Sequence, residues 1–370
     1  MSSAFKFGEL SVSIFGESHG KAIGVVIDGC PSGLSLSEED GLPGGIGIDF
    51  DAVLDFMARR APKKDGTSTM RSEKDFPNVV SGMVDGVLTG TPLCAVIQNT
   101  DQHSADYKSV SHLARPGHAD YTGYVRYNGS NDLRGGGHFS GRITAPLVFA
   151  GAIASQILES KGITTGAHIL SIMDAGDERF DPVNVNAEQL KQVRSRYLPL
   201  INTDIEQQMR DVIADAAAKL DSVGGIIEYA AVGLPAGIGS PMFDGIENRI
   251  SQAVFGVPAV KGIEFGAGFD VANMYGSNNN DEFCIENGEI RTRTNNHGGI
   301  LGGITSGMPV VFRVAMKPTP SIARPQKTVD YTTMTEETLG IKGRHDPCIV
   351  PRAVPCIESA ANLAILSYVI

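Results

Sequence analysis

The stretch "APLVFAGAIASQILESKG", residues 145–162, carries the clearest helical pattern in the sequence. Pro146 suits the first turn of a helix, where a backbone N–H has no partner within the helix, and Gly162 suits a C-terminal cap. Two further segments predict helices, residues 204–225 ("DIEQQMRDVIADAAAKLDSVGG") and the closing residues 355–370 ("PCIESAANLAILSYVI"). The fold class then depends on what lies between these helices.

Strand-like stretches and glycine clusters fill the rest of the chain. The stretches are rich in β-branched residues and bounded by turn formers, and they are residues 22–29, 91–99, 224–234 and 308–317. The 44 glycines gather in clusters such as residues 42–48, 134–141 and 295–307, which is typical of sharp turns or close backbone approach. Helices and strands follow one another irregularly, and no repeat or linker divides the chain. We therefore expect an α+β fold with residues 1–370 as a single compact unit.

Composition narrows the class of protein. A chain of 370 residues, 42% hydrophobic and 20% charged, is typical of a soluble globular protein. The net charge of -11 argues against a broad nucleic-acid surface, so an anionic ligand must meet a local positive pocket. Five cysteines without a CxxC pair favour reduced thiols over disulfides or a metal site. The start resembles no signal peptide and no run of 18 apolar residues occurs, so we expect a cytoplasmic protein with no membrane partner.

Positive charge is concentrated in residues 113–144, which hold four arginines and two histidines against two aspartates. In "ARPGHAD" the Pro-Gly pair can place Arg115 and His118 on the same side of a tight turn, where they suit phosphate or carboxylate oxygens. A structural turn with Arg115 paired to Asp120 explains the motif equally well. In "RGGGHFSGR", residues 134–142, the glycine amides could line an anion, with a plain glycine-rich hairpin as the alternative.

Three other polar stretches are candidates for the same site. His19 in "FGESHG" lies between glycines and can donate a proton near neutral pH, although an isolated histidine of this kind more often lies in a surface turn. "MARRAPKK", residues 57–64, and "KPTPS", residues 317–321, add further basic or hydroxyl-bearing turns. A charge run like the first is usually a solvated face. "KGRHDPC", residues 342–348, predicts either a functional cluster or a weak surface pair between Arg344 and Asp346.

Taken together, these motifs resemble the chorismate synthase family. "GESHG", "RPGHADYT", "RGGG..SGR.TA", "VKG.EFG.GFD", "NNHGGILGGI.SG" and "GRHDPC..PRAVP" occur in the order and approximate spacing of that family, over about residues 10 to 360. The resemblance implies helical layers packed with antiparallel sheets. It also implies a lyase of the shikimate pathway that eliminates phosphate from 5-enolpyruvylshikimate 3-phosphate to give chorismate, with reduced FMN (FMNH2) and no net redox change. A phosphate, two carboxylates and a flavin phosphate would explain the fixed cations.

The resemblance also implies roles for individual residues. His19 is similar to the general acid that protonates the departing phosphate, His118 to the histidine beside the N1/C2 edge of the flavin, and Asp346 to the aspartate that helps flavin N5 accept a proton. The matching substrate-binding arginines are Arg60, Arg115, Arg142 and Arg344. The matching flavin-binding residues are Ser140, Pro258, Ala259, Gly302, Lys317, Pro318, Thr319, Pro320, Ser321 and Arg344. The resemblance implies no metal. It implies a homotetramer and an external reductant for the flavin.

Two positions depart from the family pattern. The glycine-rich loop commonly reads Arg-Ser-Ser where this chain has His138, Phe139 and Ser140, and a second arginine expected six residues after Arg60 is replaced by Gly66. Lys63, Lys64 or Arg71 is a candidate to replace that arginine.

Two rival classes of function stay open. One is a flavin-dependent oxidoreductase, since some members of the family reduce flavin with NADPH; the sequence has no GxGxxG after a strand to bind a dinucleotide. The other is a non-catalytic module that binds a phosphorylated metabolite. NAD(P)H oxidation without added reductant tests the first class, and phosphate release under anaerobic, reduced-flavin conditions tests the second.

Overall fold

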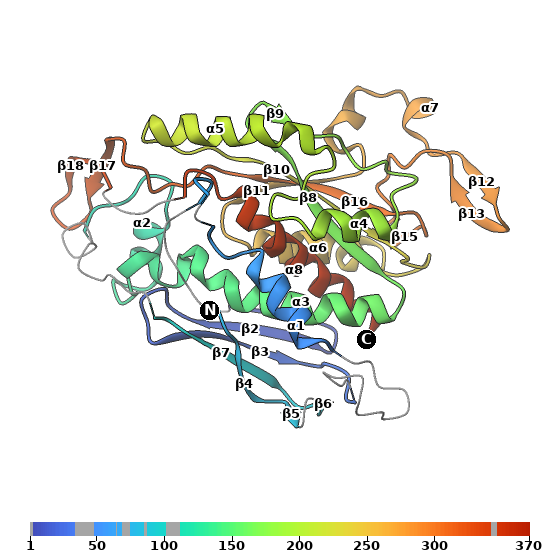
Figure 1. The fold of residues 1–370 in the computed structure, drawn as a ribbon, viewed down its shortest axis with the longest axis horizontal. Coiled ribbons are helices and arrows are strands. Elements are labelled where there is room, and N and C mark those ends of the chain that lie inside the picture. The colour runs from blue at the N-terminus through green and yellow to red at the C-terminus, as the bar shows by residue number, and fades with distance from the viewer. Residues whose placement is uncertain are drawn as a thin grey trace.

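Two antiparallel sheets face each other across a layer of helices (Figure 1). The computed structural model describes residues 3–33, 48–63, 65–68, 75–84, 87–100, 112–341 and 346–370. Within these ranges the first sheet consists of β1 (Ala4–Phe7), β2 (Leu10–Gly16), β3 (Ala22–Asp28), β7 (Leu93–Gln98) and β4 (Asn78–Ser81), in this order. The second consists of β11 (Val260–Phe265), β16 (Val310–Met316), β10 (Gly225–Val232), β8 (Thr164–Ile172) and β9 (Ala175–Gly176). The α+β prediction is confirmed.

Helices and short hairpins complete the described part of the chain. The α-helices are α1 (Phe50–Ala58), α2 (Asp120–Arg126), α3 (Thr144–Ser160), α4 (Ala187–Arg194), α5 (Glu206–Ala218), α6 (Ile246–Phe255), α7 (Gly276–Asn279) and α8 (Val350–Val369). The 3-10 turns are η3 (Arg134–Phe139), η4 (Gly141–Ile143), η5 (Thr203–Ile205), η6 (Met242–Asp244) and η7 (Gly268–Asn273). The hairpins are β5 (Met83–Val84) with β6 (Val87–Leu88), β12 (Phe283–Glu286) with β13 (Glu289–Thr292), β14 (Ile300–Leu301) with β15 (Ile304–Thr305), and β17 (Gln326–Asp330) with β18 (Thr335–Leu339).

The four predicted strands are confirmed as β3, β7, β10 and β16. In the second sheet, β10 pairs antiparallel with β8 on one side and β16 on the other, so that Tyr229 lies opposite Ala167 and Phe312. The rings of Tyr229 and Phe312 stack with centroids 4.6 Å apart, and the Tyr229 hydroxyl donates to Asn362 Oδ1 on α8 at 3.0 Å. This contact joins the sheet to the helical layer, because a buried phenol needs a partner for its O–H.

Helices α3 and α8 form the centre of the molecule. The predicted helix 145–162 is confirmed as α3, and Gly162 follows it with φ of +78°, as a C-terminal cap requires. A Cβ on Gly151 would lie 2.1 Å from Ser359 Cβ, so the glycine lets α3 approach α8 closely. The prediction for residues 355–370 placed the start of the last helix too late: α8 begins at Val350, and Pro355 lies inside it at the cost of one helical hydrogen bond.

The segment Gly141–Ser160 is long and apolar enough to cross a membrane by length and composition alone. However, 78% of this stretch is buried inside the protein, and α3 packs against α8 and against strands of both sheets (Figure 1). A helix that is apolar on all sides is also what the core of a large fold requires. We therefore assign the segment to the core.

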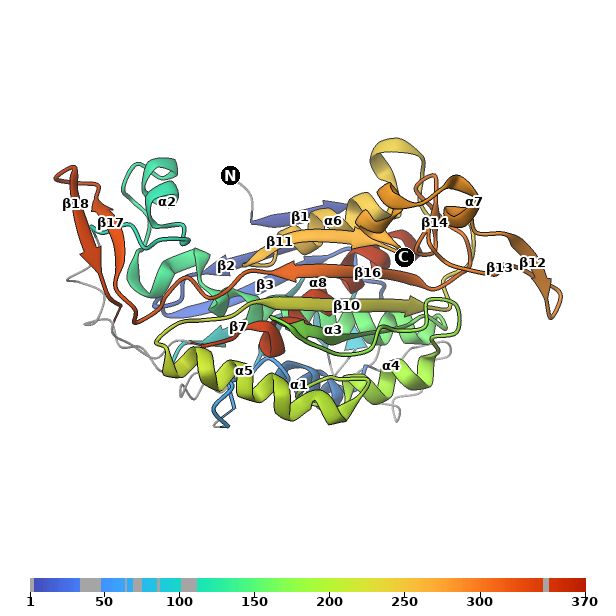
Figure 2. The ribbon, with the colours of Figure 1, turned by 90° about the horizontal axis from the view of Figure 1, so that it is seen from above.

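The two ends of the molecule differ (Figure 2). One end carries α2 and the β17–β18 hairpin, and the other carries α7 and the β12–β13 hairpin. The chain enters α3 through η3 and η4, which lie toward the α2 end, and α8 starts directly after residues 346–349. The motifs that hold Arg142 and Asp346 therefore meet where the two central helices begin, whereas the glycine cluster 295–307 lies toward the α7 end.

Candidate active site

A cavity of about 800 Å³ lies where η3, η4 and the start of α8 meet the end of α6 and the segment after β16. Its size falls in the range of about 300–1,000 Å³ that is usual for small-molecule and cofactor sites. The basic residues that line it are Arg60, Arg115, His118, His138, Arg142, Lys261, Lys317 and Arg352. Within the described ranges, Asp346 is the single acidic residue in the lining. The chain is acidic overall, but this cavity is cationic, as the sequence predicted for an anion-binding protein.

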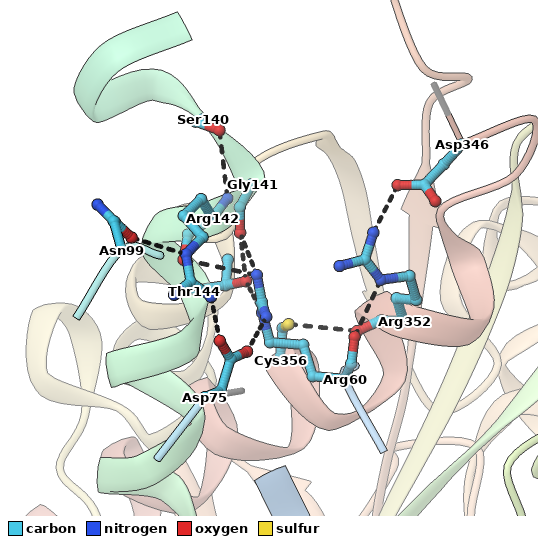
Figure 3. A network of polar contacts seen from close by, with 10 residues as sticks. All are labelled: Arg60, Asp75, Asn99, Ser140, Gly141, Arg142, Thr144, Asp346, Arg352 and Cys356. Carbon is cyan, nitrogen blue, oxygen red and sulfur yellow. Dashed lines mark hydrogen bonds and ion pairs between the residues drawn. The ribbon is translucent and has the colours of Figure 1, made fainter. Parts of the chain in front are cut away.

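Arg60 and Arg142 form one buried cluster with Asp75 (Figure 3). Arg60 Nη1 donates to Asp75 Oδ2 at 2.7 Å, and Arg142 Nη1 donates to the other carboxylate oxygen. The Nε groups are held as well, that of Arg60 by Thr144 Oγ1 at 2.8 Å and that of Arg142 by Asn99 Oδ1 at 3.0 Å. Burial, with the nearby positive charges of Arg352 and Arg142, lowers the pKa of Arg60, while Asp75 opposes that shift. The solvated-face interpretation of "MARRAPKK" is therefore wrong for Arg60.

The solvated-face interpretation is wrong for Arg59 as well, whose side chain is only 12% exposed. Its guanidinium makes a two-pronged ion pair with Glu358 on α8, at 2.6 and 2.8 Å, and Glu358 is fully buried. Glu358 also accepts from the backbone N–H of Ala167 on β8. The pair joins α1, α8 and the second sheet, so this neighbour of Arg60 holds the fold and leaves Arg60 to face the cavity.

Arg115 and His118 share one carboxylate, that of Asp120. Arg115 donates from Nε and Nη2 to the two oxygens at 2.6 Å each, and His118 Nδ1 lies 2.8 Å from Asp120 Oδ1. Although burial alone would raise it, these contacts hold the pKa of Asp120 well below its ordinary range. The structural Arg115–Asp120 turn is thus confirmed, yet Arg115 and His118 also line the cavity. The ion pair with Asp120 therefore leaves Arg115 and His118 at the cavity wall, and their anion-binding role stays a prediction.

The glycine-rich loop fits against both histidines. Gly135, Gly136 and Gly137 all have positive φ, at 61°, 87° and 55°. A Cβ on Gly135 would lie 2.1 Å from the His19 ring, and a Cβ on Gly136 would lie 3.0 Å from His118 Nε2. The plain hairpin interpretation is wrong, because the loop is a 3-10 turn whose missing side chains make room for two imidazoles.

His19 does not lie in a surface turn. It is only 3% exposed, and it lies outside the cavity lining behind Gly135, which does line it. Ser140 lines the cavity and caps η4 by accepting from Arg142 N. His138 also lines it, with Nδ1 2.8 Å from the carbonyl oxygen of Gly16, so this departure from the family pattern supports the strand that precedes His19.

The predicted flavin-binding residues divide into three groups. Pro258, Ala259, Lys317, Thr319, Pro320 and Ser321 line the cavity together with Ser140. Pro318 and Gly302 are not in the lining, and Gly302 lies in the turn between β14 and β15. Arg344 lies outside the described residues. Thr319 Oγ1 is buried without a hydrogen-bond partner in the described structure, although buried hydroxyls are normally paired. An orphaned hydroxyl at a cavity wall is suited to a bound polar ligand.

Asp346 lines the cavity and is held there by Arg352, a residue that the sequence analysis did not single out. Arg352 Nη1 donates to Asp346 Oδ2 at 2.6 Å, and its Nε donates to the carbonyl oxygen of Arg60 at 2.9 Å (Figure 3). The clue was present in the sequence, since Arg352 belongs to the quoted motif "PRAVP". Lys261 had the same clue, since it belongs to the quoted motif "VKG.EFG.GFD", whereas Asn99 and Asp75 lie in none of the family motifs.

Lys63 is the one described candidate to replace the arginine missing at Gly66, and it does not line the cavity. Gly66 has φ of +85° and no atom within 4 Å of an added Cβ, and the Lys63 ammonium lies 5.4 Å from the ring centre of Tyr197. Lys64 and Arg71 lie outside the described residues. Within the described ranges, no group of three or more His, Cys, Asp or Glu side chains could hold a metal ion.

Comparison with known proteins shows which family this chain belongs to. The family model described as "Chorismate synthase" matches residues 10–40 and 39–370. The chain is 42% identical over 364 residues to the chorismate synthase of Korarchaeum cryptofilum, covering 98% of this chain and 96% of that protein. It is 44% identical over 359 residues to that of Methanocella arvoryzae, with 97% and 92% covered. A structure titled "Crystal Structure of Chorismate Synthase" matches with a TM-score of 0.72 and 28% identity, over 98% of this chain and 92% of the other. The chain therefore belongs to the chorismate synthase family of lyases.

Proposed function

We propose that the protein eliminates phosphate from 5-enolpyruvylshikimate 3-phosphate to give chorismate, with reduced FMN bound in the same cavity. The observation that carries this proposal is the cationic lining of the cavity in a chain of net charge -11. A substrate with one phosphate and two carboxylates needs several fixed cations, and arginine offers paired N–H donors to each group. Arg60, Arg115 and Arg142 are proposed to bind these groups, and Arg344 is proposed with them from sequence alone.

The cavity also fits a flavin. Lys317 and Ser321 line it, and Thr319 Oγ1, between them in the sequence, offers an orphaned polar atom. We propose that Ser140, Pro258, Ala259 and the segment 317–321 hold FMN. Bound in its reduced form, a flavin would supply an electron-rich ring and a proton-accepting N5 without net redox change.

The protein's own groups would then handle protons. His19 is proposed as the acid for the departing phosphate. Gly135, which lines the cavity and has no side chain, lies against its ring. His118, held by Asp120 through Nδ1, is proposed to face the flavin with its other nitrogen. Asp346, fixed by Arg352, is proposed to take part in removing the substrate proton.

Anaerobic assay of phosphate release tests the proposal. The protein should release phosphate from 5-enolpyruvylshikimate 3-phosphate only with reduced FMN, and the flavin should still be reduced when the substrate is consumed. Full-rate release without flavin would contradict the proposed mechanism. No release with reduced flavin would favour the anion-binding module. NAD(P)H oxidation by the protein alone would show that it also reduces flavin, whereas a need for added reductant would fit the external reductant we expect.

The family also suggests a cytoplasmic homotetramer. Large apolar side chains are exposed at the end of the molecule that carries α7 and the β12–β13 hairpin, among them Tyr275 and Ile285, at 82% and 80% exposure. Exposed apolar surface of this kind is typical of a contact with another chain. Light scattering should give a mass four times that of the chain, and a monomer at micromolar concentration would contradict the proposal.

A further inference from the structure

Two buried arginines at the cavity share one carboxylate, that of Asp75. The side chains of Arg60 and Arg142 are each 4% exposed and that of Asp75 is 7% exposed. The arginines come from the end of α1 and from η4, which are far apart in the sequence, and Asp75 precedes β4 (Figure 3). Each oxygen of the carboxylate accepts from a different guanidinium, so the aspartate sets the spacing between them.

The three residues differ in their relation to the cavity. Arg60 and Arg142 line it, whereas Asp75 is not among the described residues that do. Asp75 therefore contacts the guanidinium groups from a side that an anion in the cavity does not need. One carboxylate between two guanidinium groups leaves one net positive charge, buried and facing the cavity, where its attraction for an anion is weakly screened.

We propose that Asp75 is a positioning residue that holds Arg60 and Arg142 together as one anion-binding pair. The pair would bind the phosphate or a carboxylate of the substrate, and this identification of the ligand rests on the proposed function. The alternative is that Asp75 competes with the incoming anion for the same guanidinium groups.

The two roles predict opposite signs for Asp75→Asn. An amide is close in shape but carries an NH2 in place of one oxygen, so it faces at least one guanidinium with a donor. A positioning carboxylate that is lost lets the two cations separate, and anion binding becomes weaker. A competing carboxylate that is lost leaves a more positive site, and anion binding becomes tighter.

Calorimetric titration of the whole protein with inorganic phosphate, without flavin or turnover, measures this sign. Wild type should bind phosphate, and Arg142→Ala should abolish that binding. Asp75→Asn should weaken it by about tenfold to thirtyfold, and Asp75→Glu, which keeps the charge but changes the geometry, by less. Asp215→Asn is the matched control, since it breaks an exposed pair with Lys219 and should leave phosphate binding unchanged.

Each outcome of the phosphate titration either supports or overturns the positioning role of Asp75. Equal or tighter phosphate binding by folded Asp75→Asn overturns the positioning role, as does the absence of phosphate binding in wild type. If Asp75→Asn fails to fold, Asp75→Glu decides alone, because wild-type affinity in that variant would show that the geometry of the pair is unimportant. In the phosphate-release assay, the variants should raise KM more than they lower kcat. Failure of the proposed reaction leaves the phosphate titration intact, so the two proposals are tested separately.

Discussion

Gly135→Ala should separate the role of the His19 ring from the backbone strain of the glycine loop. The substitution has two effects: alanine at φ of 61° is strained, and its Cβ would lie 2.1 Å from Cε1 and Nδ1 of His19, more than 1 Å short of the 3.4 Å at which ordinary contact begins. The strain costs about 1–2 kcal/mol of folding free energy. The overlap can be relieved only if the ring or the loop moves by more than 1 Å.

Gly162→Ala is the matched control for this variant. Gly162 has φ of +78°, and an added Cβ meets no atom within 4 Å. It therefore reproduces the strain without the overlap, at the far end of α3. Urea denaturation should show Gly162→Ala destabilised by about 1–2 kcal/mol and Gly135→Ala by at least as much, because relief of the overlap adds to the strain.

Activity should distinguish the two variants. A displacement of about 1 Å in a catalytic group can cost about 100-fold in rate, so kcat for phosphate release should fall by about that factor in Gly135→Ala and remain near wild type in Gly162→Ala. Stopped assays under reduced flavin measure both. A kcat for Gly135→Ala within about threefold of the control would refute the view that the glycine sets a catalytically important position of His19.

Three further outcomes follow from buried ionisable groups. Because the pKa of Asp120 lies below its ordinary 3.8, its stabilising contribution is present above that pH and lost below it; the difference in free energy of unfolding between wild type and Asp120→Asn should therefore shrink from pH 6 to pH 3, and a constant difference would contradict this. Although burial alone would lower it, contacts with Asp177 and Glu228 raise the pKa of His168, so its contribution is complete below about pH 6.5 and lost at higher pH; His168→Gln should destabilise the protein more at pH 6 than at pH 9, and the reverse would be contradictory. Burial raises the pKa of Cys30 to about 11 and of Cys348 to about 12, so mass spectrometry of the alkylated native protein should show the partly exposed Cys94 and Cys284 modified before them, and early modification of Cys348 would argue against its burial.

Local patterns in the sequence predicted the elements better than their boundaries. The strand at residues 224–234 and the helix at 145–162 are correct because burial on both sides makes most of their residues apolar. The start of α8 was missed because Pro355 suggests a helix start, whereas Pro351 occupies that place near the N-terminus. Tertiary packing of α8 against α3 outweighs the hydrogen bond that Pro355 removes.

The site was predictable only in part, for a different reason. Arg60, Arg115 and Arg142 could be proposed because they belong to motifs. Asp75 could not, because an aspartate gains meaning only through the two arginines that the fold brings to it from distant segments. For Arg115 the sequence predicted both a pair with Asp120 and an anion-binding side chain, and the structure shows the paired arginine at the cavity wall.

An acidic chain forms a cationic cavity here by placing carboxylates behind the cations. Asp75 contacts Arg60 and Arg142, and Asp120 contacts Arg115 and His118. Neither aspartate is among the described residues that line the cavity. Burying guanidinium groups without counter-ions would cost several kcal/mol each, so some carboxylate must be near. Sharing the Asp75 carboxylate between two guanidinium groups leaves excess positive charge on the cavity side, and it does so with fixed geometry. Local charge at this site therefore depends on which side of each arginine its aspartate occupies, which is independent of the net charge of the chain.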